Sequence, residues 1–148
     1  MPAVILISVP SAESIEHTIF SHNANAPICN AQPITGTPRV TEKKTGTNYE
    51  YIINESLRAV FIGKESKITS CAFVCFDESS AAEFLAQAVT ACYNFGGIDA
   101  GSACYDSILA DFMSARSGTN PEPSAIQGLL YKISREPFGY TFTLVRIE

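Results

Sequence analysis

The hydrophobic pattern is clearest in three consecutive runs near the middle of the chain. Tyr49, Tyr51 and Ile53 alternate with other side chains at a period of two, which is typical of a strand with one buried face. Leu57–Ile62 and Ile68–Phe76 are the next two apolar runs, and short polar or glycine-opened segments separate them. Three such runs with tight links predict an antiparallel meander.

The third run is apolar on both of its faces. One face carries Cys71, Phe73 and Cys75, and the other carries Ala72, Val74 and Phe76. A strand with two apolar faces is usually central or covered by a helix. We therefore expect this strand to lie at the centre of the fold.

A long amphipathic helix is predicted directly after this strand. Asp77 or Ser79 can cap the start of the helix, and acidic side chains favour the positive end of a helix dipole. The predicted apolar stripe consists of Leu85, Ala88, Val89, Cys92 and Phe95, with Ala81 and Phe84 at its margin. Two consecutive glycines, Gly96 and Gly97, predict the end of the helix.

The C-terminal third predicts a second helix and a hairpin. The helix covers residues 99–117, and a segment rich in Gly and Pro at 118–128 follows it. Leu129–Ser134 and Tyr140–Ile147 are predicted strands, and Glu136–Gly139 is the turn between them.

The N-terminal third is less regular. Val4–Val9 is predicted to be a buried strand and not a signal peptide, because no basic region precedes it. A short helix is expected from Ser11 to about Asn23. An irregular connection then leads to an edge strand around Arg39–Glu42.

These elements predict an α+β fold, an antiparallel strand meander packed by a long helix, with an extra helix and a C-terminal hairpin. Residues 1–117 would form the core domain. Residues 118–128 would be a linker, and 129–148 a hairpin that packs on the core.

The composition indicates which kinds of partner and which cellular compartment to expect. The formal net charge is −5 and no basic run exists, which argues against nucleic acid as a partner. No apolar run approaches the roughly 20 residues of a transmembrane helix. The five cysteines form no CxxC pair, so we expect free thiols, no metal site and a cytoplasmic location.

No catalytic constellation stands out. His17 and His22 are five residues apart, which places them about 140° apart around a helix, so they are poorly placed to share a metal. Cys29 lies between prolines, without a helix start to lower its pKa. Asp77 and Glu78 are better explained as helix-start acids than as an acid–base pair. We therefore predict a non-enzymatic protein that needs no cofactor.

The segment Ile68–Phe95 resembles the C-terminal half of a phosphotyrosine-binding (PTB) domain, which belongs to the PH-like superfold. The similarity lies in Cys71-Ala72-Phe73-Val74-Cys75, in the turn Asp77-Glu78-Ser79-Ser80, and in the helix that follows. In such domains a peptide adds as a strand at a sheet edge beside the last helix. The resemblance implies an adaptor with Tyr49–Asn54 as the edge strand.

By this resemblance, the peptide-binding residues would be Tyr49, Tyr51, Ile53, Phe84, Leu85, Ala88, Val89 and Cys92. The arginines are widely scattered along the sequence, and a phosphate pocket needs them clustered. The expected recognition of a peptide or protein partner is therefore independent of phosphate.

Two further similarities are more limited. The sequence around Phe138-Gly139-Tyr140-Thr141-Phe142 is similar to the opening of a PDZ domain, and the meander with two helices is similar to a longin-like module. The size and negative charge also fit an acidic inhibitor, such as an immunity protein that neutralises a basic toxin or enzyme. The sequence leaves the partner and the oligomeric state open.

Overall fold

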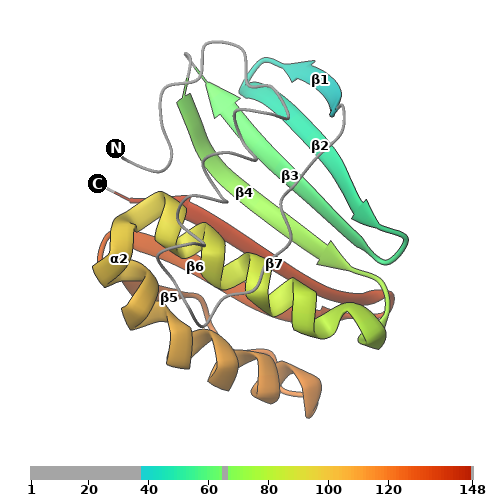
Figure 1. The fold of residues 1–148 in the computed structure, drawn as a ribbon, viewed down its shortest axis with the longest axis vertical. Helices are drawn as coiled ribbons and strands as arrows, with labels where there is room; N and C mark the ends of the chain where they lie inside the picture. Colours follow the sequence, from blue (N-terminus) through green and yellow to red (C-terminus); the bar gives the residue numbers. More distant parts are fainter. Residues whose placement is uncertain (1–37, 65–66, 148) are drawn as a thin grey trace.

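The computed structural model describes residues 38–64 and 67–147, which form one antiparallel sheet with helices on one of its faces (Figure 1). The predicted strand at Val4–Val9, the helix after Ser11, and the residues His17, His22 and Cys29 lie outside the described residues. The predicted α+β class, a strand meander packed by helices with a C-terminal hairpin, is confirmed.

Within the described residues the sheet has seven strands in the order β1-β2-β3-β4-β7-β6-β5. The strands are β1 (Arg39–Lys43), β2 (Gly46–Asn54), β3 (Leu57–Lys64), β4 (Lys67–Cys75), β5 (Ser124–Ile126), β6 (Leu129–Glu136) and β7 (Gly139–Arg146). The meander predicted for the middle of the chain is β2-β3-β4, and the predicted edge strand near residue 39 is β1.

The C-terminal hairpin is a central part of this sheet. Phe142 of β7 lies opposite Phe73 of β4 on one side and opposite Ile133 of β6 on the other. The stacked rings of Phe73 and Phe142 are 6.1 Å apart between centroids. The sheet therefore runs without interruption from the meander β2-β3-β4 through β7 to β6. The predicted C-terminal hairpin is part of the same sheet.

The helical layer follows β4 directly. A 3-10 turn, η1 (Glu78–Ser80), leads into α2 (Ala81–Arg116). Asp77 caps the turn, because its side chain accepts a hydrogen bond from the Ser79 N–H at 3.2 Å. The prediction of a helix start at this position is confirmed.

α2 consists of two arms that meet at a kink. Gly97 has φ 89° and ψ −176°, a conformation that side chains disfavour. Near the kink, a Cβ on Gly101 would lie 2.3 Å from the ring of Tyr93. Glycine therefore permits both the kink and the close approach of the arms. No helix in the described part of the chain is long and apolar enough to cross a bilayer.

Polar and aromatic contacts close the opposite end of the two arms. Glu78, where the first arm begins, accepts a hydrogen bond from Tyr140 Oη at 2.9 Å. It also pairs with Arg116, at the end of the second arm, at 3.1 Å. The rings of Phe112 and Tyr140 are 4.8 Å apart between centroids, and Phe84 packs against both. These contacts tie both arms to β7.

The hydrophobic core lies between the arms of α2 and one face of the sheet. Its fully buried large side chains include Tyr51, Leu57, Phe73, Phe84, Ile108, Leu129, Tyr131, Ile133, Phe142 and Leu144. The predicted stripe of the first arm is partly wrong, because Phe84 is fully buried whereas Leu85 is only partly buried. Gln87, Thr90 and Asn94 are also buried, which the helical pattern did not predict.

The outer edge of β6 is only partly paired by β5. Before the start of β5, the side chain of Asn120 takes the place of a strand beside β6. Its amide accepts from the Arg135 N–H at 2.8 Å and donates to the Arg135 carbonyl at 3.3 Å. Lys132 Nζ donates to the carbonyl of Pro121 at 2.9 Å. Side chains and loop thus occupy much of this edge.

Candidate binding surface

The structure places the predicted peptide-binding residues mainly in the core. Six of them are buried: Tyr49, Tyr51, Phe84, Ala88, Val89 and Cys92. The other two, Ile53 and Leu85, are partly buried and pack against the core. Side chains in these positions stabilise the fold and offer little surface to a peptide.

The geometry of the predicted groove also differs. The first half of β2 is paired on both sides, since Tyr49 lies opposite Val40 of β1 and opposite Phe61 of β3. The contacts of α2 with the sheet are mainly with β4, β6 and β7, on the other half of the sheet. The described residues therefore do not bring the β2 edge and the helix together as two walls of one groove.

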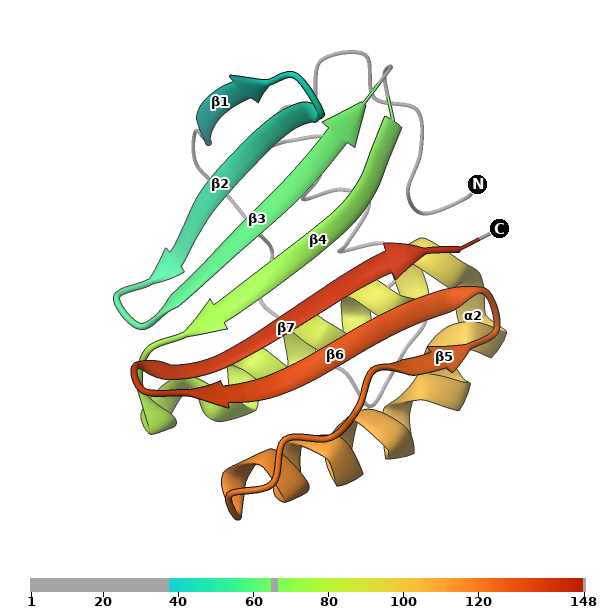
Figure 2. The same cartoon turned by 180° about the vertical axis from the view of Figure 1, so that it is seen from behind.

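Within the part of the chain that the structure describes, a different surface is open: the face of the sheet that α2 leaves uncovered (Figure 2). Strand register places its outward side chains in rows across the sheet. The first row is Asn48, Ile62, Ser70, Val145 and Leu130; the second is Glu50, Val60, Ala72, Thr143 and Lys132; the third is Ile52, Arg58, Val74, Thr141 and Ser134. We call this surface the helix-free face.

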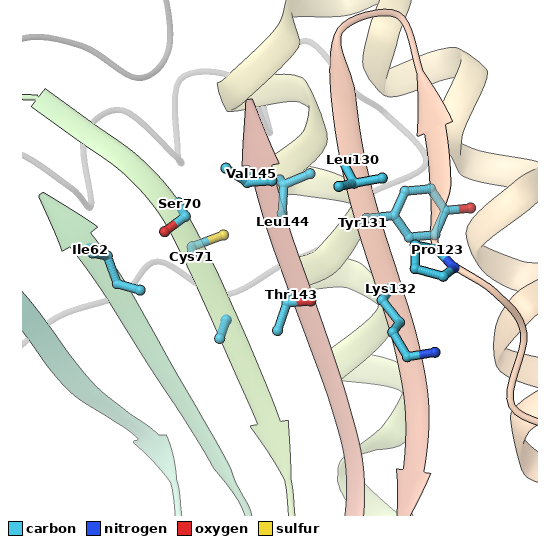
Figure 3. A pocket seen from close by; sticks show the side chains of 11 residues that line it. Ile62, Ser70, Cys71, Pro123, Leu130, Tyr131, Lys132, Thr143, Leu144 and Val145 are labelled. Carbon is cyan, nitrogen blue, oxygen red and sulfur yellow. The ribbon is translucent and has the colours of Figure 1, made fainter. Parts of the chain in front are cut away.

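The helix-free face contains a hollow of about 340 Å³ (Figure 3). Its floor is formed by small side chains of the central strands, Ser70 and Ala72 of β4 and Thr143 of β7. Longer side chains border it, Ile62 from β3 and Leu130 from β6. The hollow thus arises because side-chain size drops in the middle of the sheet.

The remaining lining residues belong to the rim or to the core layer. They are Cys71, Pro123, Tyr131, Lys132, Leu144 and Val145. Alternation along the strands directs Cys71, Tyr131 and Leu144 to the helix side, where they are buried. The accessible lining is therefore mostly apolar, with one ammonium group, that of Lys132, at the rim.

The charged groups of the helix-free face are unevenly paired. Glu50 is engaged by Arg39 of β1 at 3.0 Å. Arg58 and Lys132 take part in no ion pair within the described residues. This face therefore carries two cations outside any ion pair, in a chain whose formal net charge is −5. One further carboxylate of the face, Glu136 at the end of β6, is hydrogen-bonded by the Ser134 hydroxyl.

The titratable groups behind this face are structural. Burial raises the pKa of the Cys71 thiol, and it also raises that of Cys75. Burial raises the pKa of Tyr131 to about 12. Thiols held in the protonated form are poor nucleophiles and poor metal ligands. In residues 38–64 and 67–147, no group of three His, Cys, Asp or Glu side chains lies close enough to hold a metal ion.

Sequence reasoning missed the helix-free face, although a signal for it exists. Ser70, Ala72 and Val74 alternate with the buried row of β4, and none of them is charged. Thr141, Thr143 and Val145 repeat the pattern on β7. A water-facing row of a strand usually carries charged or long polar side chains. Two small, uncharged rows thus indicate a surface suited to contact.

Comparison with models of protein families, with curated proteins and with solved structures found no match. The resemblances to PTB, longin-like and PDZ domains therefore stay predictions.

Proposed function

We propose that this protein is a non-enzymatic interaction module that binds a segment of a protein partner on the helix-free face of its sheet. The proposal rests mainly on the hollow of about 340 Å³ between β3 and β6, which has a floor of small side chains and a mostly apolar lining. This site replaces the edge-and-helix groove expected from sequence, whose residues are largely in the core.

The exposed apolar side chains of this face support binding for a physical reason. Solvent-facing sheet surfaces are normally polar, because exposed apolar area gains free energy when it leaves water. Contiguous apolar patches on folded domains commonly mark contact sites. On this face Ile52 is 64% exposed, and Val60, Ile62, Val74 and Leu130 are partly exposed. A docked partner would cover these side chains.

Phosphate-independent recognition remains part of the proposal. A phosphate site needs two or more arginines that converge on one point. Among the described arginines, Arg39 and Arg116 are held in ion pairs, and Arg135 donates to the Arg116 carbonyl at 2.6 Å. Arg58 is the arginine in the three rows of the helix-free face, which suits a single carboxylate better than a phosphate.

A cytoplasmic location is also proposed. The four cysteines in the described part of the chain, Cys71, Cys75, Cys92 and Cys104, are free and buried. Free thiols are typical of proteins in reducing compartments.

The test is selection of peptides from a displayed random library, followed by mapping of the bound peptide by amide chemical shifts. We expect shifts on β4 and β7 at Ser70, Ala72 and Thr143. Ala72→Arg fills the hollow and should abolish binding. Ala110→Arg, the same change at an exposed position of α2, is the matched control and should leave binding unchanged.

Three results would contradict the proposal. These are selection of no peptide, shifts confined to the helices, and equal binding by the Ala72→Arg variant. Binding that requires a basic peptide and weakens steeply with salt would instead favour the acidic-inhibitor function.

A further inference from the structure

One end of the helix-free face carries two exposed aromatic side chains. Phe76, which follows β4, is 45% exposed, and Phe138, in the turn between β6 and β7, is 47% exposed. Pairing of Cys75 with Tyr140 brings these segments together, and the two ring centroids are 5.7 Å apart. The exposure of this apolar ring area to water is unfavourable, and aromatic side chains are enriched at interfaces.

Arg58 lies against this aromatic pair. It sits on the outward side of β3 opposite Val74, and its guanidinium carbon is 5.5 Å from the centroid of the Phe76 ring. Stacking on an aromatic ring holds a guanidinium in place while leaving its N–H groups free to donate at the edge.

The hydrogen bonds of Arg58 are incomplete. Its Nη1 is buried and has no hydrogen-bond partner in the described part of the chain. A buried donor without an acceptor is unfavourable, and more so when the donor is charged. The guanidinium therefore gains a hydrogen bond if the side chain shifts so that an incoming acceptor reaches this nitrogen.

The carboxylates that follow β4 are already engaged elsewhere. Asp77 caps η1 by accepting from the Ser79 N–H, and Glu78 pairs with Arg116. Arg58 belongs to neither of the two ion pairs found within the described residues.

We propose that Arg58, Phe76 and Phe138 together bind an acidic side chain of the partner segment, with a bulky apolar residue beside it. The guanidinium would hold the carboxylate through paired N–H donors, and the two rings would cover the neighbouring apolar side chain. This inference rests on the proposed function and adds the chemistry of the partner: an acidic, apolar segment that runs from the aromatic pair toward the hollow.

The charge of the face favours a separate partner over a second copy of this chain. In a two-fold dimer each residue of the face meets the same face of the other copy. Two faces that each carry the cations Arg58 and Lys132 outside any ion pair would then be apposed, and like charges across an interface are repulsive. An acidic segment meets both cations favourably.

The experiment uses two fluorescent peptide libraries that are identical except at one position. One has a fixed Leu-Asp-Phe centre and the other a fixed Leu-Asn-Phe centre, with random flanking residues. Binding of each library to the full chain is measured by anisotropy. We expect the Asp library to bind about tenfold more tightly, since a charged hydrogen bond gives a larger gain than a neutral one.

The variants separate the roles of charge and ring. Arg58→Met keeps the apolar stem but removes the charge, so the Asp and Asn libraries should bind about equally. Phe138→Ser, at an exposed turn position, should weaken both libraries. Arg146→Met is the matched control, because Arg146 pairs with the buried Leu129 and so belongs to the opposite face. It should keep the preference.

The outcomes distinguish the two proposals. Equal binding of both libraries, or a preference that survives Arg58→Met, overturns the carboxylate site. If Ala72→Arg still abolishes binding in that case, the helix-free face stands as the binding surface. Failure of both libraries to bind overturns both proposals. A dimer that Phe138→Ser converts to a monomer would make the aromatic pair a self-association surface and overturn the inference.

Discussion

Two buried tyrosines should make the stability of this protein fall steeply at alkaline pH. Tyr51 and Tyr131 are each only 1% exposed. Burial raises the pKa of each to about 12 from the ordinary value of 10.0; the charge of Tyr49 adds to the effect at Tyr51. The folded protein thus resists formation of the two phenolates, whereas the unfolded chain does not.

The sign and the size follow from proton linkage. Between pH 10 and pH 12 the unfolded chain has lost these protons and the folded protein has kept them, so the free energy of unfolding falls as pH rises. A pKa that is higher by two in the folded protein than in the unfolded chain corresponds to about 2.7 kcal/mol per tyrosine, or roughly 5 kcal/mol for the pair. That is comparable to the whole stability of many domains, about 5–15 kcal/mol. Below pH 10 this contribution is fully present.

The assay is urea unfolding followed by circular dichroism at a series of pH values from 8 to 12, with Tyr51→Phe and Tyr131→Phe. Each variant should remove the part of the alkaline loss that comes from its own tyrosine, about 2.7 kcal/mol. The buried thiols of Cys71 and Cys75, whose pKa burial also raises, contribute the same loss in every variant. At neutral pH their effects should have opposite signs. Tyr131 Oη is hydrogen-bonded to Ser107, so its loss costs about 1 kcal/mol. Tyr51 Oη is buried with no hydrogen-bond partner in the described residues, so its removal should stabilise the protein by about 1 kcal/mol.

The double variant gives the decisive result. If it loses as much stability between pH 9 and pH 12 as the original protein, the alkaline transition does not come from these tyrosines. The burial argument would then be refuted.

Three further predictions concern the helical layer and the thiols. Gly101→Ala puts a methyl group against the Tyr93 ring and should destabilise the protein by about 1–3 kcal/mol in urea unfolding; a gain in stability would contradict the close approach of the arms. Glu78→Ala removes the contacts to Tyr140 and Arg116 and should cost about 1 kcal/mol, since the ion pair is half exposed; a loss above 3 kcal/mol would not fit. A thiol reagent at pH 8 should leave the described cysteines unlabelled in the folded protein and label them in urea, as read by peptide mass; rapid labelling of any of Cys71, Cys75, Cys92 or Cys104 when folded would contradict their burial.

Local patterns predicted most of the elements because short-range physics decides them. The period of two in β2 and β4, the cap at Asp77 and the break at Gly97 all depend on neighbouring residues. The position of the C-terminal hairpin did not follow from such patterns. Pairing of β7 with β4 is a long-range choice, and turn chemistry at Glu136–Gly139 carries no information about it.

The predicted peptide-binding residues are mostly core residues for a related reason. The apolar row of a helix or strand shows that it is buried, and it does not show what buries it. Tyr51 and Val89 were assigned to a groove, yet both are buried in the core. The informative positions were the small side chains Ala72 and Thr143, which become a shared floor only after β4 and β7 are paired.

The central position of β7 has a consequence for how the chain reaches its folded state. Ser70 pairs with Val145 and Cys75 with Tyr140. One edge of β4 therefore stays unpaired until β7, which is synthesised much later, is available. Until then, one side of β4 presents unpaired amide and carbonyl groups next to Phe73. Long-range pairing of this kind slows folding and exposes nascent chains to aggregation. We therefore expect the pairing of β7 with β4 to be the step at which folding competes with aggregation.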